Sequence, residues 1–224
     1  MATQTKAVPQ EKKQTATITA PNLQTAIFSV VGESPYVQHK YSQKARRQIM
    51  ATQQAGSQSQ SRKKREPRDF DAEYKAAMHI SEDGWTGIPA PSFRNAMISA
   101  CRLVNFKMVY AKLSVFVVAD GFDGDDGTPL VKIIGEPEKH EASVRLESGV
   151  CSVITRPMWR RWSCELKVTW DLDQFSLNDV SNLLQRAGQQ VGIGEGRNGS
   201  PNSNGIGWGS FRVATDAKPR KKAA

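Results

Sequence analysis

A glycine-rich loop near the C-terminus is the first stretch whose residues could do chemistry. Seven of the 17 glycines lie between Gly192 and Gly209, in "GIGEGRNGSPNSNGIGWG". Because glycine lacks a Cβ, such a backbone can bring its N–H groups close to phosphates or bases. The same composition is typical of a flexible linker, and no strand precedes it, as a P-loop or a dinucleotide-binding loop would require. The composition leaves ligand binding and a plain loop both open.

A second candidate is the segment 156–164, "RPMWRRWSC", in which arginines are interleaved with tryptophans. Indole rings stack on bases and guanidinium groups pair with phosphates, so this pattern suits binding of a single nucleic-acid strand. The alternative interpretation is a sheet edge with one tryptophan buried and the arginines in water.

Histidines and aspartates offer weaker evidence of catalysis. His39, His79 and His140 are scattered along the chain, which is typical of structural or surface residues, although His39 could serve as a general acid or base. Four aspartates lie close together: Asp120, Asp123, Asp125 and Asp126. They lack the glycine and glutamate of an EF-hand loop, so we predict a tight hairpin loop there. We expect no catalytic residue, no metal and no cofactor.

Cysteine usage and apolar content indicate the compartment. Cys101, Cys151 and Cys164 cannot all pair and have no metal-ligand spacing, so we interpret them as reduced core thiols. The chain has no apolar run near the roughly 20 residues that span a bilayer, and its first residues lack the apolar stretch of a signal peptide. These features predict a cytoplasmic protein with no membrane partner.

The net charge of +9 is concentrated in two segments. Residues 40–68 hold nine Lys or Arg and one Glu, and residues 218–222 add four more positive charges, so the rest of the chain is mildly acidic. An acidic body with two basic appendages is typical of a protein that binds a polyanion. A solubilising charge run or an address signal would have the same composition.

The elements that must position these residues follow from hydrophobic periodicity. We predict strands at 23–31, 111–120, within 151–172, where Pro157 marks an edge or a turn, and at 207–215, and a peripheral hairpin of 129–135 with 141–147. One helix begins after an N-cap at Ser92 and runs to Val104. A second has a capping box of Ser176 and Asp179 and ends at Gly188.

This order, β-α-β-β-α-β, predicts an α+β fold of the ferredoxin-like (RRM-like) class, with an antiparallel sheet and two helices on one face. We expect a mobile N-terminal arm at 1–16, a single domain at 17–217 and a basic tail at 218–224. A long basic insertion, 34–86, separates the first strand from the first helix, and its Gln- and Ser-rich part at 51–68 should be disordered.

Two motifs resemble one family. The segment 87–102, "GIPAPSFRNAMISACR", resembles the opening of the first helix in the RAMP superfamily of CRISPR-associated RNA-binding proteins, and "GIGEGR" with "NGIGWGSFRV" resembles the glycine-rich loop and final strand of that superfamily. The insertion is most similar to that of Cas7-type backbone subunits or of a free-standing phage or mobile-element relative. The Asp-rich segment 120–127 has no counterpart in the family.

The resemblance implies a non-catalytic subunit that binds single-stranded or guide RNA and oligomerises along it, as a homo-oligomer or a multi-subunit ribonucleoprotein. The alternatives are a RAMP-type, Cas6-like endoribonuclease and a phage single-stranded-DNA-binding protein. The expected nucleic-acid contacts are Lys40, Lys44, Arg46, Arg47, Arg62, Lys63, Lys64, Arg65, Arg94, Arg160, Arg161, Gly194, Arg197, Gly207 and Trp208.

Overall fold

The computed structural model describes residues 18–41, 43–55, 68–145, 151–200 and 206–214. The predicted N-terminal arm, the cluster Arg62 to Arg65 and the basic tail lie outside the described residues. The elements are β1 (Leu23–Gly32), β2 (Tyr36–Val37), α1 (Gln43–Ala55), α2 (Phe70–Ala76), β3 (Gly87–Pro89), α3 (Ala90–Ala100), the 3-10 helix η1 (Cys101–Val104), α4 (Met108–Ser114), β4 (Val115–Val118), β5 (Gly121–Phe122), β6 (Pro129–Lys132), β7 (Glu138–Arg145), β8 (Cys151–Trp159), β9 (Ser163–Asp171), α5 (Leu177–Arg186), the π-helical turn η2 (Ala187–Val191) and β10 (Phe211–Val213).

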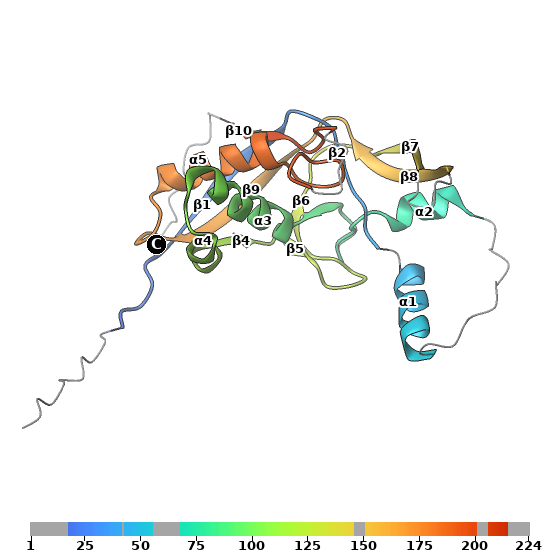
Figure 1. The fold of residues 1–224 in the computed structure, drawn as a ribbon, viewed down its shortest axis with the longest axis horizontal. Helices are drawn as coiled ribbons and strands as arrows, with labels where there is room; N and C mark the ends of the chain where they lie inside the picture. Colours follow the sequence, from blue (N-terminus) through green and yellow to red (C-terminus); the bar gives the residue numbers. More distant parts are fainter. Residues whose placement is uncertain (1–17, 42, 56–67, 146–150, 201–205, 215–224) are drawn as a thin grey trace, which may run out of the picture.

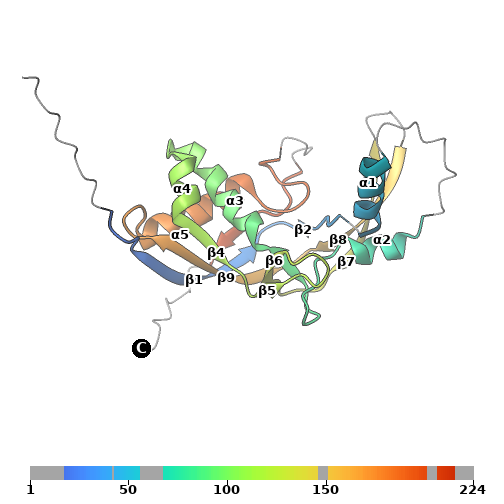
Figure 2. The ribbon, with the colours of Figure 1, turned by 90° about the horizontal axis from the view of Figure 1, so that it is seen from below.

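The main sheet has the strand order β10-β1-β9-β4, and every neighbouring pair is antiparallel. Helices α3 and α5 lie on the same side of this sheet and contact each other (Figure 2). The core between these layers contains the fully buried side chains of Phe93, Met97, Leu166 and Leu184. The predicted α+β class with antiparallel sheets is confirmed.

Two smaller sheets lie beside the main sheet and contribute residues to the same core, among them Trp159 and Ile88. One has the order β2-β8-β7 and the other β3-β6-β5. Helices α1 and α2 lie with β7 and β8 at the opposite end from α5 and β4 (Figure 1). Elements β2, α1 and α2 fall within the segment 34–86, so this segment carries structure of its own, and residues 51–55 of the stretch predicted to be disordered belong to α1. Among the described residues, no helix has the length and apolar character needed to cross a membrane.

The predicted peripheral hairpin of 129–135 with 141–147 is wrong. Strand β6 pairs with β3 and β5, whereas β7 pairs with β8 along its whole length. Leu130 and Val131 of β6 are both fully buried, and they gain this burial by pairing with β3, whose Ile88 is also in the core. An outlying hairpin could not have buried both residues.

The strand pairing also shows that the position predicted for Pro157, at an edge or turn, is wrong. This residue lies inside β8, between β7 and β2, where its carbonyl accepts a hydrogen bond from the backbone N–H of Gln38 (3.1 Å). Of the three cysteines, all of which are free, Cys151 is exposed, so only Cys101 and Cys164 are core thiols.

The first predicted helix differs at both ends. Helix α3 begins at Ala90, and its N-cap, Pro89, lies three residues before the predicted cap at Ser92, because a proline near the start of a helix needs no N–H partner. It changes to η1 at Cys101, and Val104 is 45% exposed rather than part of the buried face. The strand predicted at 111–120 is α4 in its first part and β4 only from Val115 to Val118.

The second predicted helix is confirmed at its start. The Ser176 hydroxyl accepts from the N–H of Asp179 (3.2 Å), and the Asp179 carboxylate accepts from the N–H of Ser176 (2.9 Å). The predicted end at Gly188 is wrong, because the chain continues through η2 to Gly192 (φ +73°). Gly188 instead allows close packing, since a Cβ there would overlap the backbone carbonyl of Phe211 in β10.

Candidate functional site

A cleft of about 700 Å³ lies between three segments of the molecule. Residues 36–41 of the insertion form one side, one face of α3 forms the second, and residues 191–200 of the glycine-rich loop form the third. These segments are far apart in the sequence. The pairing of β2 with β8 and the packing of η2 against α3 bring these three segments together.

Helix α3 presents polar side chains to this cleft. Ser92, Asn95 and Ser99 line it, and their spacing of three and four residues places them on one face of the helix. Phe93 and Met97 point to the opposite side, into the core. Among the described residues, no hydrogen-bond partner is found for the side chains of Ser92, Asn95 and Ser99. This wall therefore offers unpaired hydroxyl and amide groups to the cleft.

The insertion contributes an aromatic pair. The rings of His39 and Tyr41 stack with centroids 5.5 Å apart and planes inclined by 29°, and Tyr41 is 64% exposed. Nδ1 of His39 lies 3.8 Å from Oε2 of Glu195, which Arg156 also binds through Nε (2.9 Å). Burial and the charge of Arg156 lower the pKa of His39, although Glu195 acts in the opposite direction. His39 is thus mainly neutral near pH 7, and the pair presents an aromatic surface.

The glycine-rich loop is folded against the protein itself. The N–H of Glu195 donates to the carbonyl of Val37 (2.9 Å), and the N–H of Gly209 donates to that of Pro35 (2.7 Å). A Cβ at Gly194 (φ +78°) would lie 2.5 Å from the carbonyl oxygen of Val37. The predicted close approach of a ligand to the backbone at Gly194 is therefore wrong, because β2 occupies that space.

Other predicted residues of this loop have different surroundings. Arg197 lines the cleft and donates from Nη1 to the carbonyl of Gly194 (2.9 Å). Trp208 packs edge-on against His140 (5.4 Å between centroids) and covers Gly196, where a Cβ would lie 2.6 Å from the indole. A Cβ at Gly207 (φ +82°) would make an ordinary contact with Oδ1 of Asn198 (3.5 Å).

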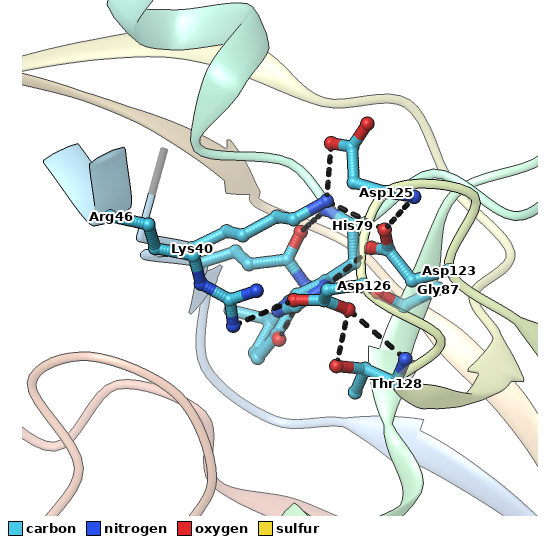
Figure 3. Close-up of polar contacts among 10 residues, drawn as sticks. Lys40, Arg46, His79, Gly87, Asp123, Asp125, Asp126 and Thr128 are labelled. Atoms are coloured by element: carbon cyan, nitrogen blue, oxygen red, sulfur yellow. Dashed lines mark hydrogen bonds and ion pairs between the residues drawn. The ribbon is translucent and has the colours of Figure 1, made fainter. Parts of the chain in front are cut away.

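A buried ionic network lies beside the cleft, and Lys40 is at its centre (Figure 3). Its ammonium binds Oδ1 of Asp123 (2.7 Å) and Oδ2 of Asp125 (2.8 Å), and the residue is only 6% exposed. The prediction that Lys40 contacts a phosphate is therefore wrong. The predicted hairpin of the Asp-rich loop is confirmed by the pairing of β5 with β6, but Asp123 points inward rather than into solvent.

His79 and Asp126 complete this network. Nδ1 of His79 lies 2.7 Å from Oδ2 of Asp123, and Asp126 binds Arg46 (3.0 Å) and the Thr128 hydroxyl (2.6 Å). Donor atoms of His79, Asp123 and Asp126 lie within 4.8 Å of one another, as in a metal site. However, the Lys40 ammonium and the Arg46 guanidinium already neutralise these carboxylates. The chemistry of the cluster favours an internal ion-pair network over a bound cation.

The network sets the protonation of its members. Burial by itself would raise the pKa of Asp123, but hydrogen bonds from Lys40, the Asp125 N–H and His79 outweigh it and hold the pKa below its usual range. Burial lowers the pKa of His79, and its bond to Asp123 only partly opposes this. His79 is therefore neutral in the folded protein at neutral pH, and its hydrogen bond to Asp123 fixes the ring.

This burial of His79 predicts a loss of stability in mild acid. Because its folded pKa lies below the value of about 6.5 in the unfolded chain, the unfolded state binds more protons as the pH falls through that value, and folding is disfavoured. We expect the melting temperature to fall from about pH 7.5 to about pH 5.5, and to fall less in a His79→Asn variant. Equal declines in both proteins, measured by circular dichroism, would show that His79 does not titrate on unfolding.

The remaining predicted contacts are not gathered at the cleft. Nε of Arg94 donates to the carbonyl of Val115 (2.9 Å), and the guanidinium also binds the carbonyl of Lys112 and lies over the Phe116 ring. The Arg94 side chain holds α3 to the α4–β4 junction, and its contact with a phosphate stays a prediction.

The Arg/Trp segment is also corrected. Trp159 and Trp162 are both buried in the core, where they pack against Tyr36, so neither can stack on a base. Arg161 is exposed, and Arg160 is exposed but paired with Glu138. The alternative interpretation, a sheet edge with one buried tryptophan and arginines in water, is closer to the observed structure, although both tryptophans are buried.

The cations of the insertion that we predicted to bind phosphates lie in different surroundings. Arg46 and Arg47 are exposed on α1, and Arg46 also pairs with Asp126. Lys44 belongs to α1, but its side chain lies outside the described part of the structure, as do Arg62, Lys63, Lys64 and Arg65.

The polar cleft-lining residues that the sequence analysis missed include Gln38, Tyr41, Asn95 and Ser99, together with Ser92, which was assigned as a cap. The polar stripe of α3 could have been found, because it alternates with an apolar face at helical spacing. Tyr41 had no comparable signal. A scan against models of known protein families found no family that matches this chain, and a search of curated proteins found no significant match.

Proposed function

We propose that this chain binds single-stranded RNA without cleaving it, and that the strand runs from the basic insertion into the cleft. The observation that carries this proposal is the position of the His39–Tyr41 pair. The pair lines the cleft, and Lys44, Arg46 and Arg47 of the insertion follow it in the sequence. Stacking surfaces next to phosphate-binding cations are the usual combination in proteins that bind single strands.

The core supports this proposal through its topology. In chain order, β1, β4, β9 and β10 are joined by α3 between the first two strands and α5 between the last two. The spatial order β10-β1-β9-β4 is the one expected for a β-α-β-β-α-β core, so we propose a ferredoxin-like fold. Membership of the RAMP superfamily and assembly of several copies along RNA, in the cytoplasm, are parts of the same proposal.

A non-catalytic role is supported by the partners of the two histidines near the cleft. His79 is bonded to Asp123, and His39 faces Glu195, so both carry acidic neighbours that belong to structural contacts. The alternative, a RAMP-type endoribonuclease acting through His39, is favoured by the presence of that residue in the cleft. Labelled RNA should stay intact after incubation with the protein and Mg²⁺, and cleavage that disappears in a His39→Ala variant would establish the alternative.

Replacing Tyr41 with alanine tests the proposed binding mode. Stacking of a base on an aromatic side chain contributes about 1–3 kcal/mol, so we expect the affinity for single-stranded RNA to fall by about tenfold or more, whatever the base sequence. Fluorescence anisotropy measures this change. Tyr110→Ala, on α4 and outside the cleft, is the matched control and should bind as the wild type does. Equal affinities of the Tyr41 and Tyr110 variants would remove Tyr41 from the binding site.

A further inference from the structure

We infer that the cleft recognises the ribose of RNA, so that the protein selects RNA over DNA through the polar face of α3. In this arrangement one nucleotide enters the cleft, its base stacks on Tyr41, and its 2′-hydroxyl bonds to the side chains of Ser92 and Asn95. This inference rests on the proposed function, because it names the chemical group that the cleft reads once a strand is bound there.

The α3 wall of the cleft carries no charged side chain in the described part of the structure, since its lining residues there are Ser92, Asn95, Ala96 and Ser99. Among the described residues that line the cleft there is no lysine. In the glycine-rich loop, Arg197 donates from Nη1 to the carbonyl of Gly194, and the carboxylate of Glu195 is paired with Arg156. A phosphate placed against α3 would therefore find little positive charge. Phosphates fit better beside the exposed arginines of α1, Arg46 and Arg47, which follow Tyr41 in the chain.

The α3 wall is instead suited to a neutral hydroxyl. Serine hydroxyls and the asparagine amide can each donate and accept hydrogen bonds, and so can the ribose 2′-hydroxyl. Ser92 and Asn95 have no side-chain partner among the described residues, so they can bond a ligand without breaking a contact of the protein. The 2′-hydroxyl is the group by which a protein distinguishes RNA from DNA.

The size of the cleft agrees with a single entering nucleotide. Its volume of about 700 Å³ lies within the range of about 300–1,000 Å³ found for pockets that hold small molecules. The aromatic pair and α3 form different sides of the same space, so a base on one side and its ribose on the other can be contacted together.

The test compares a short unstructured RNA, the DNA of the same sequence and the 2′-O-methyl RNA, each labelled and titrated with the full chain in an anisotropy assay. We expect the wild type to bind RNA about 25-fold more tightly than DNA, since two net hydrogen bonds are involved and each changes an affinity by about fivefold. The double variant Ser92→Ala with Asn95→Ala should lose this preference while its affinity for DNA stays within about twofold. The 2′-O-methyl RNA should bind like DNA.

Asn182→Ala is the matched control, because Asn182 is an exposed asparagine on α5 that does not line the cleft. It should keep the preference for RNA, and both variants should keep the melting temperature of the wild type. An unchanged RNA-to-DNA ratio in the double variant, or an equal loss of RNA and DNA binding, overturns ribose recognition alone. A wild type that binds neither polymer overturns the proposed function together with this inference.

Discussion

A Gly209→Val variant is expected to lose about 4 kcal/mol of folding free energy, and its melting temperature should fall by about 10 °C. Gly209 has φ +69°, a conformation that β-branched residues adopt only with strain. A Cβ at this position would also overlap the backbone carbonyl of Ile193, and a backbone atom cannot move aside as the end of a flexible side chain can. Thermal and urea denaturation measure the loss.

Gly84→Val is the control for this prediction. Gly84 has a similar φ of +84°, but a Cβ there would meet open space. The Gly84→Val variant should lose only the folding free energy that the backbone strain costs, about 1–3 kcal/mol. If the two variants lost the same stability, the close packing of the glycine-rich loop against its own backbone would not contribute to folding.

An Asp123→Ala variant is expected to be destabilised by about 3–5 kcal/mol, the usual cost of removing one partner from a buried ion pair. The change leaves the Lys40 ammonium without its buried partner, with only the largely exposed carboxylate of Asp125 beside it, and it removes the partner of His79 Nδ1. Urea denaturation of the variant measures the effect.

Asp173→Ala, at an exposed position of the turn before α5, is the matched control and should change stability by less than about 0.5 kcal/mol. A double variant, Lys40→Met with Asp123→Leu, should recover part of the loss, because it removes both charges together. An Asp123→Ala protein as stable as the Asp173→Ala protein would show that the network does not hold the insertion to the β5–β6 hairpin.

Local signals allowed the sequence to predict some elements well. Strand β1, the capping box of α5 and the final strand β10 were predicted because each depends on periodicity or capping within a few residues. The partners of β6 and β7 were predicted wrongly, because strand pairing depends on distant residues. The partner of β6 is β3, which is too short to be recognised as a strand from its sequence.

The candidate site was harder to predict, for a related reason. Lys40 has the sequence context of an exposed basic run, yet its charge is neutralised by Asp123, 83 residues away. The tryptophans of the segment 156–164 likewise have the composition of a binding surface and lie in the core. The glycines were correctly identified as places of close approach, but sequence composition could not show that β2 and Ile193, rather than a ligand, make the approach.

Binding of single-stranded RNA as a function of salt, by the wild type and by a variant in which Arg62, Lys63, Lys64 and Arg65 are alanines, tests the proposed function most directly. Binding of the wild type should weaken linearly in a plot of log affinity against log salt concentration, and the slope should decrease by about 0.7 for each phosphate contact that the variant loses. Variants of four exposed cations outside the insertion, Arg102, Lys107, Lys112 and Lys132, serve as the charge-matched control. A wild type that does not bind RNA, or a slope that is the same in both four-fold variants, would contradict the proposal that the basic insertion guides a single strand into the cleft.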